Sequence, residues 1–163
     1  MEKRKRYSPK FKPHRERETE PEDALVQEII ARVESELQNS IQPAIVPALN
    51  SFQRRLVHRH FDNSSLYVTK TYRHDENCEL WVYPVGNLIN FAKEKAEEAI
   101  RTGKRVVLPH MGSYERFVIH DALKVMETIK TQSFGEGEER HIEIAPVLFG
   151  RGLKKIIKKI RLF

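Results

Sequence analysis

The chain has 163 residues, 39% of them hydrophobic and 32% charged, with a formal net charge of +6 at pH 7. Such a chain can form one medium domain or two small ones around a hydrophobic core, and its single cysteine excludes a framework of intramolecular disulfides. No apolar stretch approaches bilayer length and the first residues lack the apolar segment of a signal peptide, so we expect a soluble, cytoplasmic protein.

The basic residues gather at the two ends of the chain. Residues 1–17 hold eight Lys or Arg and two Glu, and residues 148–163 hold six Lys or Arg and no acid. Each end therefore carries +6, and the part between them carries −6. Residues 1–23 are polar and interrupted by proline, which predicts a disordered basic arm. Basic ends of this kind attract polyanions through counterion release, although they can also serve only to keep a protein soluble.

Residues 24–86 are predicted to form a first unit. Apolar residues recur at helical spacing over 24–37, and the prolines in IQPAIVP then favour an extended piece. The next helix contains FQRRLVHRHF, and Asn50 with Gln53 has the spacing of a capping box at its start. Two strands are predicted after it, in SLYVTKTY and ELWVYPV.

Residues 87–148 repeat this order. A helix in NFAKEKAEEAI stops at Gly103, and a strand in RVVLP, a helix in GSYERFVIHDALKVM and strands in ETIKTQSF and HIEIAPV follow. The predicted fold class is α/β: two repeated units, each a three-stranded, mostly antiparallel sheet with helices on one face, in the order helix, strand, helix, strand, strand.

The two halves align without a gap at an offset of 62 residues. Identical pairs and matched apolar strand residues keep this register over the whole unit; among them are Pro47 and Pro109, Ser51 and Ser113, Thr69 and Thr131, Pro84 and Pro146, Leu80 and Ile142, and Val82 and Ile144. The sequence therefore predicts an internal duplication. The short connection between the halves favours close packing, which we expect to be pseudo-twofold.

An Arg-x-x-x-His pair occurs at the same point of both units, as Arg54 with His58 and Arg116 with His120. Positions i and i+4 share one face of a helix, so each pair should project together. Arginine binds phosphate oxygens bidentately, and an imidazole can hydrogen-bond a phosphate or sugar or lie against a base. One such pair is weak evidence for a binding site, because a helical histidine is more often a cap or a surface residue. The occurrence of the pair in both units strengthens this evidence. The apolar residues of the second helix are expected to point largely elsewhere, toward the sheet: Tyr114, Phe117, Val118 and Ala122.

The segment from LPHMGSYERFVIH to HIEIAP resembles an R-three-H domain, and in particular the C-terminal module of the bacterial SpoIIIJ-associated (Jag) RNA-binding proteins. The likeness covers about residues 88–147 and rests on Pro109 and Met111, Tyr114-Glu115-Arg116, Ile119-His120, Ser133 through Gly135-Glu136, and Arg140. It implies a three-stranded antiparallel sheet with helices on one face, and single-stranded nucleic acid, with RNA favoured, as the ligand. It also implies that Arg116 and His120 are the binding pair, with Arg140 nearby.

The first copy departs from this pattern in its second loop, TYRHDENCEL, which has no glycine and places Cys78 where Arg140 stands. We therefore expect the first unit to bind more weakly or differently. It gains Arg55 and Arg59 beside its pair, as further candidate contacts. Trp81 could stack on a base or pack between the units. The histidines around Cys78 lack the spacing of a closed zinc site, and we predict no metal.

The tail GLKKIIKKIRLF, within residues 149–163, has the pattern of a basic amphipathic helix. We expect it to dock on the domain and place Lys154 and Lys155 where they can contact phosphate. Binding to an anionic membrane and binding to a partner groove are the alternatives.

The function expected of the chain is binding of single-stranded RNA or DNA, without a cofactor, a small-molecule substrate or catalysis. The rival is a scaffold whose tails dock on a ribosome, a membrane or another protein, and it is favoured if the two Arg-His helices point apart.

Overall fold

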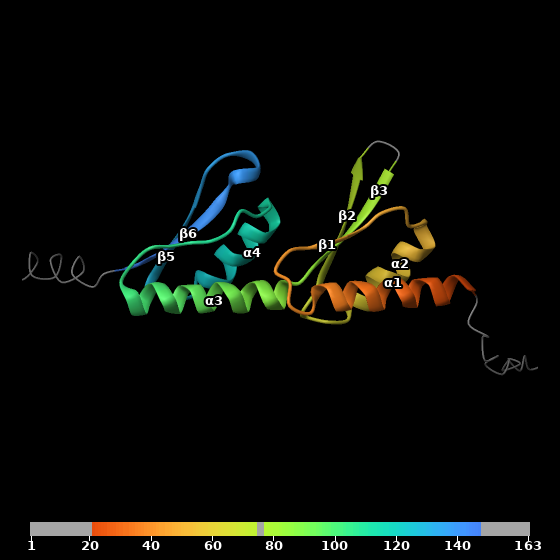
Figure 1. Cartoon of the computed structure of the whole chain (residues 1–163), viewed down its shortest axis with the longest axis horizontal. Helices are drawn as coiled ribbons and strands as arrows, with labels where there is room; N and C mark the ends of the chain where they lie inside the picture. Colours follow the sequence, from red (N-terminus) through yellow and green to blue (C-terminus); the bar gives the residue numbers. More distant parts are fainter. Residues whose placement is uncertain (1–20, 75–76, 148–163) are drawn as a thin grey trace, which may run out of the picture.

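The computed structural model describes residues 21–74 and 77–147 and contains two units (Figure 1). Most of the predicted arm, and the tail with Lys154 and Lys155, lie outside these residues. Each unit has a three-stranded antiparallel sheet with two helices, which confirms the predicted fold class. Within the described ranges, no helix is both long and apolar enough to cross a membrane.

The first unit consists of helix α1 (Pro21–Leu37), strand β1 (Ala44–Val46), helix α2 (Ser51–Asp62) and strands β2 (Val68–His74) and β3 (Asn77–Tyr83). The second consists of α3 (Val85–Thr102), β4 (Val106–Val107), α4 (Ser113–Leu123), β5 (Ile129–Phe134), the short 3-10 helix η1 (Gly137–Glu139) and β6 (His141–Pro146). The strand orders are β1-β3-β2 and β4-β6-β5, so in both units the last strand is central.

Strand pairing repeats between the units with the offset seen in the sequence. Ala44 lies opposite Val82 in the first sheet, and Val106 lies opposite Ile144 in the second. The alternate residues Leu80, Val82, Ile142 and Ile144 are fully buried, as expected for the inner face of a central strand. The helices pack on that face in each unit and close a separate hydrophobic core.

Two local predictions about helix ends are also confirmed. The amide of Gln53 donates to Oδ1 of Asn50 at 2.8 Å, and the Asn50 amide donates to Oε1 of Gln53 at 3.0 Å, so the capping box at the start of α2 is present. Helix α3 ends at Gly103, whose φ of 67° lies in the left-handed region that glycine adopts without strain.

The hairpins of the two units differ although the matched segments have equal length. In the first unit, pairing continues through Arg73 opposite Cys78 and His74 opposite Asn77. In the second, pairing stops at Phe134 opposite His141, and the chain opens into the loop that contains η1. Gly135 makes this loop possible: its φ is 82°, and a Cβ there would lie 2.8 Å from the backbone oxygen of Glu139.

The two units are packed head to tail, and the predicted pseudo-twofold arrangement is wrong. Helices α1 and α3 lie end to end, and both hairpins point to the same side (Figure 1). The ring of Tyr83 on the first sheet packs edge-on against Tyr114 on α4 at 4.7 Å between centroids. A twofold axis would add the reciprocal contact between the matched residues Ala145 and Phe52, whereas the Phe52 side chain is 49% exposed.

The start of α3 is tied to the end of α1 by Asn87. Its Nδ2 donates to the carbonyl oxygens of Leu37 at 2.8 Å and Ser40 at 3.0 Å. Ile41 also packs against the core of the second unit. These contacts fix the direction of the second unit relative to the first.

Candidate functional site

The paired arginines are held at the start of their own helices. Nη1 of Arg116 donates to the backbone oxygen of Met111 at 2.5 Å, and Nη1 of Arg54 donates to that of Leu49, also at 2.5 Å. Both side chains are half-buried. A guanidinium has five N–H donors, so each retains donors beyond this bond. The guanidinium and the positive end of the helix dipole together favour an anion at this position.

The paired histidines are fixed against the neighbouring strand through both ring nitrogens. His120 contacts the hydroxyl of Thr131 with Nδ1 at 2.7 Å and that of Ser133 with Nε2 at 3.0 Å. His58 contacts Thr69 and Thr71 in the same way. The imidazoles therefore brace α2 and α4 against β2 and β5, and direct contact of the imidazole with nucleic acid stays a prediction.

The hydroxyl partners of the histidines are residues that the sequence motifs did not assign to the site. The identity of Thr69 with Thr131 was seen as part of the repeat, and Thr71 and Ser133 occupy the next matched position of the same strand face. In both halves, two hydroxyl residues stand at matched positions, two residues apart in a strand. This pattern would have indicated the partners of the histidines.

Burial shifts the pKa of two groups beside Arg116. Burial lowers the pKa of the His120 imidazole, and the charge of Arg116 lowers it further. Glu115 is only 6% exposed, and its Oε2 accepts from the Gly112 amide at 2.6 Å. Burial raises the pKa of the Glu115 carboxyl. The hydrogen bond from Gly112 and the charge of Arg116 lower this pKa, but burial has the larger effect. Gln53 occupies the matched position of the first unit without a charge.

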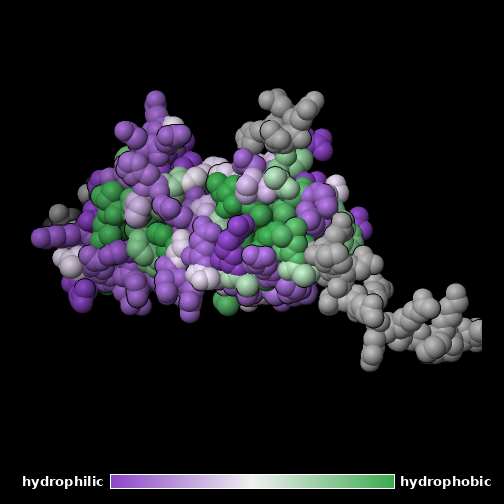
Figure 2. Space-filling model, turned by 45° about the vertical axis from the view of Figure 1, so that its right-hand side comes forward, coloured by the Kyte–Doolittle hydropathy of each residue, from purple (hydrophilic) through white to green (hydrophobic). Residues whose placement is uncertain are grey.

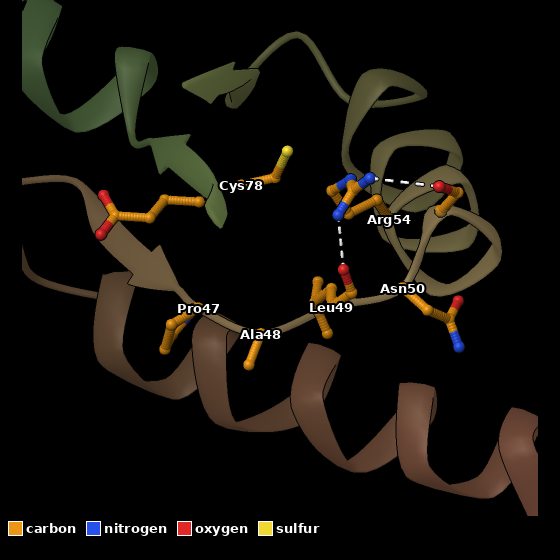
Figure 3. Close-up of a pocket in the computed structure, with 8 residues that line it drawn as sticks. Pro47, Ala48, Leu49, Asn50, Arg54 and Cys78 are labelled. Atoms are coloured by element: carbon orange, nitrogen blue, oxygen red, sulfur yellow. Dashed lines mark hydrogen bonds between the residues drawn. The ribbon is translucent and has the colours of Figure 1, made fainter. Parts of the chain in front are cut away.

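Arg54 and Cys78 line a common hollow of about 650 Å³ at the start of α2 (Figure 3). Its other walls are residues 47–51 and Glu79. Ala48, in this wall, has a φ of 57°, in the left-handed region that non-glycine residues rarely adopt. The hollow therefore brings together the arginine of the pair and Cys78, the residue that matches Arg140 of the second unit.

In the second unit, backbone hydrogen bonds place Arg140 beside the same helix start. The amide of Met111 donates to the carbonyl oxygen of Arg140 at 3.2 Å, while the Met111 oxygen accepts from Arg116. The Arg140 side chain is exposed. The Met111 backbone is thus bound by the side chain of Arg116 on α4 and by the main-chain oxygen of Arg140, just before β6.

The surroundings of the two pairs differ in charge. Cys78, Glu79 and Asp62 stand where the second unit has Arg140, His141 and Lys124. The Thr69 hydroxyl donates to Oδ1 of Asp62 at 2.6 Å, which brings an acid next to the partner of His58. Arg55 and Arg59 are exposed on α2, one turn apart. The first unit has lost positive charge beside the strands and gained it on the helix.

The expectation that the apolar residues of α4 point toward their own sheet is wrong for Phe117. Its side chain is 63% exposed, while Val118 is buried in the core. Tyr114 is half-buried and faces the first unit, where its ring meets Tyr83. Of the four residues expected to face the sheet, only Val118 is buried, and the buried face of α4 is completed by Glu115, Ile119 and Leu123.

Among the described residues, no group of three His, Cys, Asp or Glu side chains is arranged to hold a metal ion. His60, one of the histidines weighed for zinc, instead contacts Oε1 of Glu34 with its Nε2 at 2.8 Å and joins α2 to α1. Trp81 lies half-buried on the outer face of the first sheet, and its Nε1 donates to Glu79 at 3.1 Å.

Comparison with known proteins identifies the second unit. Residues 86–146 match the family model of the R-three-H domain. A segment of 60 residues is 42% identical to the RNA-binding protein KhpB of Bacillus subtilis (strain 168), and it covers 36% of this chain and 29% of that protein. The second unit is therefore an R-three-H domain, similar to part of KhpB. The chain spans less than a third of that relative's length, and its first unit lies outside the match to the family model.

Proposed function

We propose that this protein binds single-stranded nucleic acid, with RNA favoured, through the start of α4 in its R-three-H domain. Arg116 contacts phosphate, Arg140 adds a second positive charge, and His120 holds α4 in position. The first unit, within residues 24–86, is a divergent R-three-H-like copy that binds more weakly through Arg54, with Arg55 and Arg59. The role is binding without catalysis.

One observation carries the proposal: the same arginine anchor and the same histidine brace are built in both units. The anchors are Arg116 to Met111 and Arg54 to Leu49, each at 2.5 Å, and the histidines contact matched hydroxyls. A guanidinium fixed in advance loses little rotamer freedom when it binds phosphate. The match to the R-three-H family and the RNA-binding name of the relative KhpB support RNA as the ligand.

The head-to-tail packing supports a shared strand. Because the two units have the same orientation in Figure 1, their Arg-His helices lie on corresponding sides of the molecule. A strand that reaches both sites binds the second one at high effective concentration. Residues 148–163 follow the second unit directly and carry six further basic residues, including Lys154 and Lys155, for sequence-independent phosphate contact.

The test is fluorescence anisotropy with single-stranded and duplex RNA and DNA of mixed sequence, across a salt series. Arg116→Ala should weaken single-strand binding by about tenfold or more, as expected for loss of a charge-assisted contact, and Arg54→Ala should weaken it less. The matched control is Arg101→Ala, which removes the same charge from the exposed last turn of α3. Equal small losses for all three variants would contradict the proposal.

A protein-docking scaffold is the second candidate function. It is favoured by a hollow of about 680 Å³ beside α1, whose lining includes Ile29 and the exposed side chains of Leu25 and Ile45, each 47% exposed. Figure 2 shows hydrophobic areas on an otherwise mostly hydrophilic face. Nucleic-acid binding that survives Arg54→Ala/Arg116→Ala but disappears when the chain ends before Gly150 would favour this reading.

A further inference from the structure

Five aromatic rings form a continuous run from the first unit to the second. Its members are Tyr72 on β2, Trp81 and Tyr83 on β3, and Tyr114 and Phe117 on α4. Successive ring centroids are 5.1 Å apart for Tyr72 and Trp81, 6.1 Å for Trp81 and Tyr83, 4.7 Å for Tyr83 and Tyr114, and 6.4 Å for Tyr114 and Phe117. We call these residues the aromatic run.

Only part of the aromatic run is used to hold the units together. Tyr83 is buried, and its hydroxyl lies 3.0 Å from that of Tyr72. Phe117, at the other end, is 63% exposed and nearly parallel to Tyr114, with 25° between the ring planes. Tyr72, Trp81 and Tyr114 are half-buried. The ends of the run therefore offer aromatic surface to solvent, while its centre is a packing contact.

A positive charge is fixed on the aromatic run. Nζ of Lys70 lies 3.3 Å from the centroid of the Tyr114 ring, a cation–π contact between the two units. Lys70 stands opposite Trp81 in the sheet, so the ammonium and the indole share one face. The carboxylate on this face, Glu79, accepts from the Trp81 indole and so orients the ring.

We propose that the aromatic run is a second nucleic-acid contact, on which bases of a single strand stack after leaving Arg116. The inference rests on the proposed function and adds a site that needs both units. Phe117 is next to Arg116 on α4 and points about 100° away around the helix, so a strand held by that guanidinium reaches the exposed ring by passing around α4. Bases stack on Phe117 and on the Tyr72–Trp81 pair, and Lys70 contacts the phosphate between them. Aromatic rings beside a cation suit an unpaired strand, whose bases present their faces.

Trp81 makes this site directly observable, because it is the single tryptophan of the chain. We would excite it selectively and titrate the full chain with a mixed-sequence single-stranded RNA, measuring Trp81 emission and anisotropy of the labelled RNA in parallel. The expected result is saturable quenching with the same midpoint as the anisotropy change. Duplex RNA should quench much less.

Phe117→Ala should weaken single-strand binding at least about fivefold, as expected for loss of one stacked base. It should fold normally because Phe117 is largely exposed. Its matched control is Phe52→Ala, which removes a ring that is 49% exposed on α2, and Val125→Ala controls for an exposed apolar residue after α4.

The Lys70→Met variant keeps an apolar stem over Tyr114 but removes the positive charge. It should reduce the salt dependence of single-strand binding by about one phosphate contact.

The outcomes separate this inference from the function it rests on. Anisotropy that shows binding lost in Arg116→Ala, with no Trp81 quenching and unchanged binding of Phe117→Ala, overturns the aromatic site and leaves the proposed function standing. The absence of any single-strand binding overturns both. Quenching together with weaker binding by Phe117→Ala, but not by Phe52→Ala, supports the shared surface.

Discussion

The guanidinium of Arg116 and the backbone oxygen of Met111 lie 2.5 Å apart, so the side chain expected to bind a ligand is already held by its own chain. The same bond joins Arg54 to Leu49. A side chain held in this way loses less conformational entropy on binding than a free surface arginine does. The bond also uses the geometry of the guanidinium, since one N–H reaches the carbonyl while others remain available.

Arg116→Lys should therefore weaken single-strand binding by about tenfold, even though the charge is kept. A lysine ammonium is a point charge without the planar fork, and it cannot hold the Met111 oxygen and pair bidentately with phosphate. Anisotropy titration measures the loss, with Arg101→Lys on α3 as control. Binding of Arg116→Lys equal to that of the wild type would mean that charge alone matters at this position.

His120→Gln should lower the free energy of unfolding by about 1–3 kcal/mol, because it disrupts the hydrogen bonds to Thr131 and Ser133. A pH effect should accompany it. The pKa of His120 is lowered in the folded protein, chiefly by burial, whereas in the unfolded chain it is about 6.5. Between these two values the unfolded state binds more protons, so wild-type stability should fall as pH drops below about 6.5.

Urea unfolding at pH 7.5, 6.5 and 5.5 measures both effects. The His120→Gln variant should lose less stability over this range than the wild type does. His110→Gln, at an exposed histidine of the second unit, serves as the control. An unchanged slope in His120→Gln would show that other groups cause the acid sensitivity.

Glu115→Gln should leave the protein at least as stable as the wild type at pH 7.5. Burial raises the pKa of the Glu115 carboxyl, so between its ordinary value of 4.5 and the raised value the folded state binds more protons. Stability therefore falls as pH rises through this window, and the variant should lack this fall. Glutamine keeps an oxygen acceptor for the Gly112 amide, as Gln53 does for Asn50.

Chemical denaturation from pH 4 to pH 7.5 is the measurement for Glu115→Gln. The gain over the wild type should shrink toward the acid end, where the carboxyl is protonated in both states. Glu97→Gln, at an exposed position of α3, controls for the lost surface charge. A variant that is less stable than the wild type at pH 7.5 would show that the ionised carboxylate makes the better cap.

Gly135→Ala should destabilise the second unit by about 2 kcal/mol or more. Its φ of 82° is unfavourable for alanine, and the new Cβ would lie 2.8 Å from the Glu139 backbone oxygen. Gly137→Ala is the matched control, since Gly137 also has a positive φ, 54°, but its Cβ would meet nothing within 4 Å. The control should lose only about 1–2 kcal/mol. Thermal unfolding compares the two, and equal losses would show that the loop relaxes around the alanine.

The helices and strands, the repeat and the inner faces of the sheets could be predicted from the sequence, because each depends on the spacing of residue types along the chain. Alternation of apolar and polar residues predicts Leu80, Val82, Ile142 and Ile144 on the inner faces, and the offset of 62 residues aligns both Arg-His pairs. The position of each arginine and histidine on one helix face follows from their spacing of four. These features are determined by neighbours in the chain, and the sequence contains them directly.

The packing between the units, and what each paired side chain touches, were decided by the tertiary structure alone. The spacing of apolar residues within α4 does not determine which side of the helix contacts the other unit. The exposure of Phe117, the contact of Tyr114 with Lys70 and the head-to-tail order of the units were therefore not predicted. The histidine braces were missed for the same reason, since His120 lies 11 residues from Thr131. Contacts between distant residues arise when separate elements pack, and they depend on shape and charge that no single segment carries.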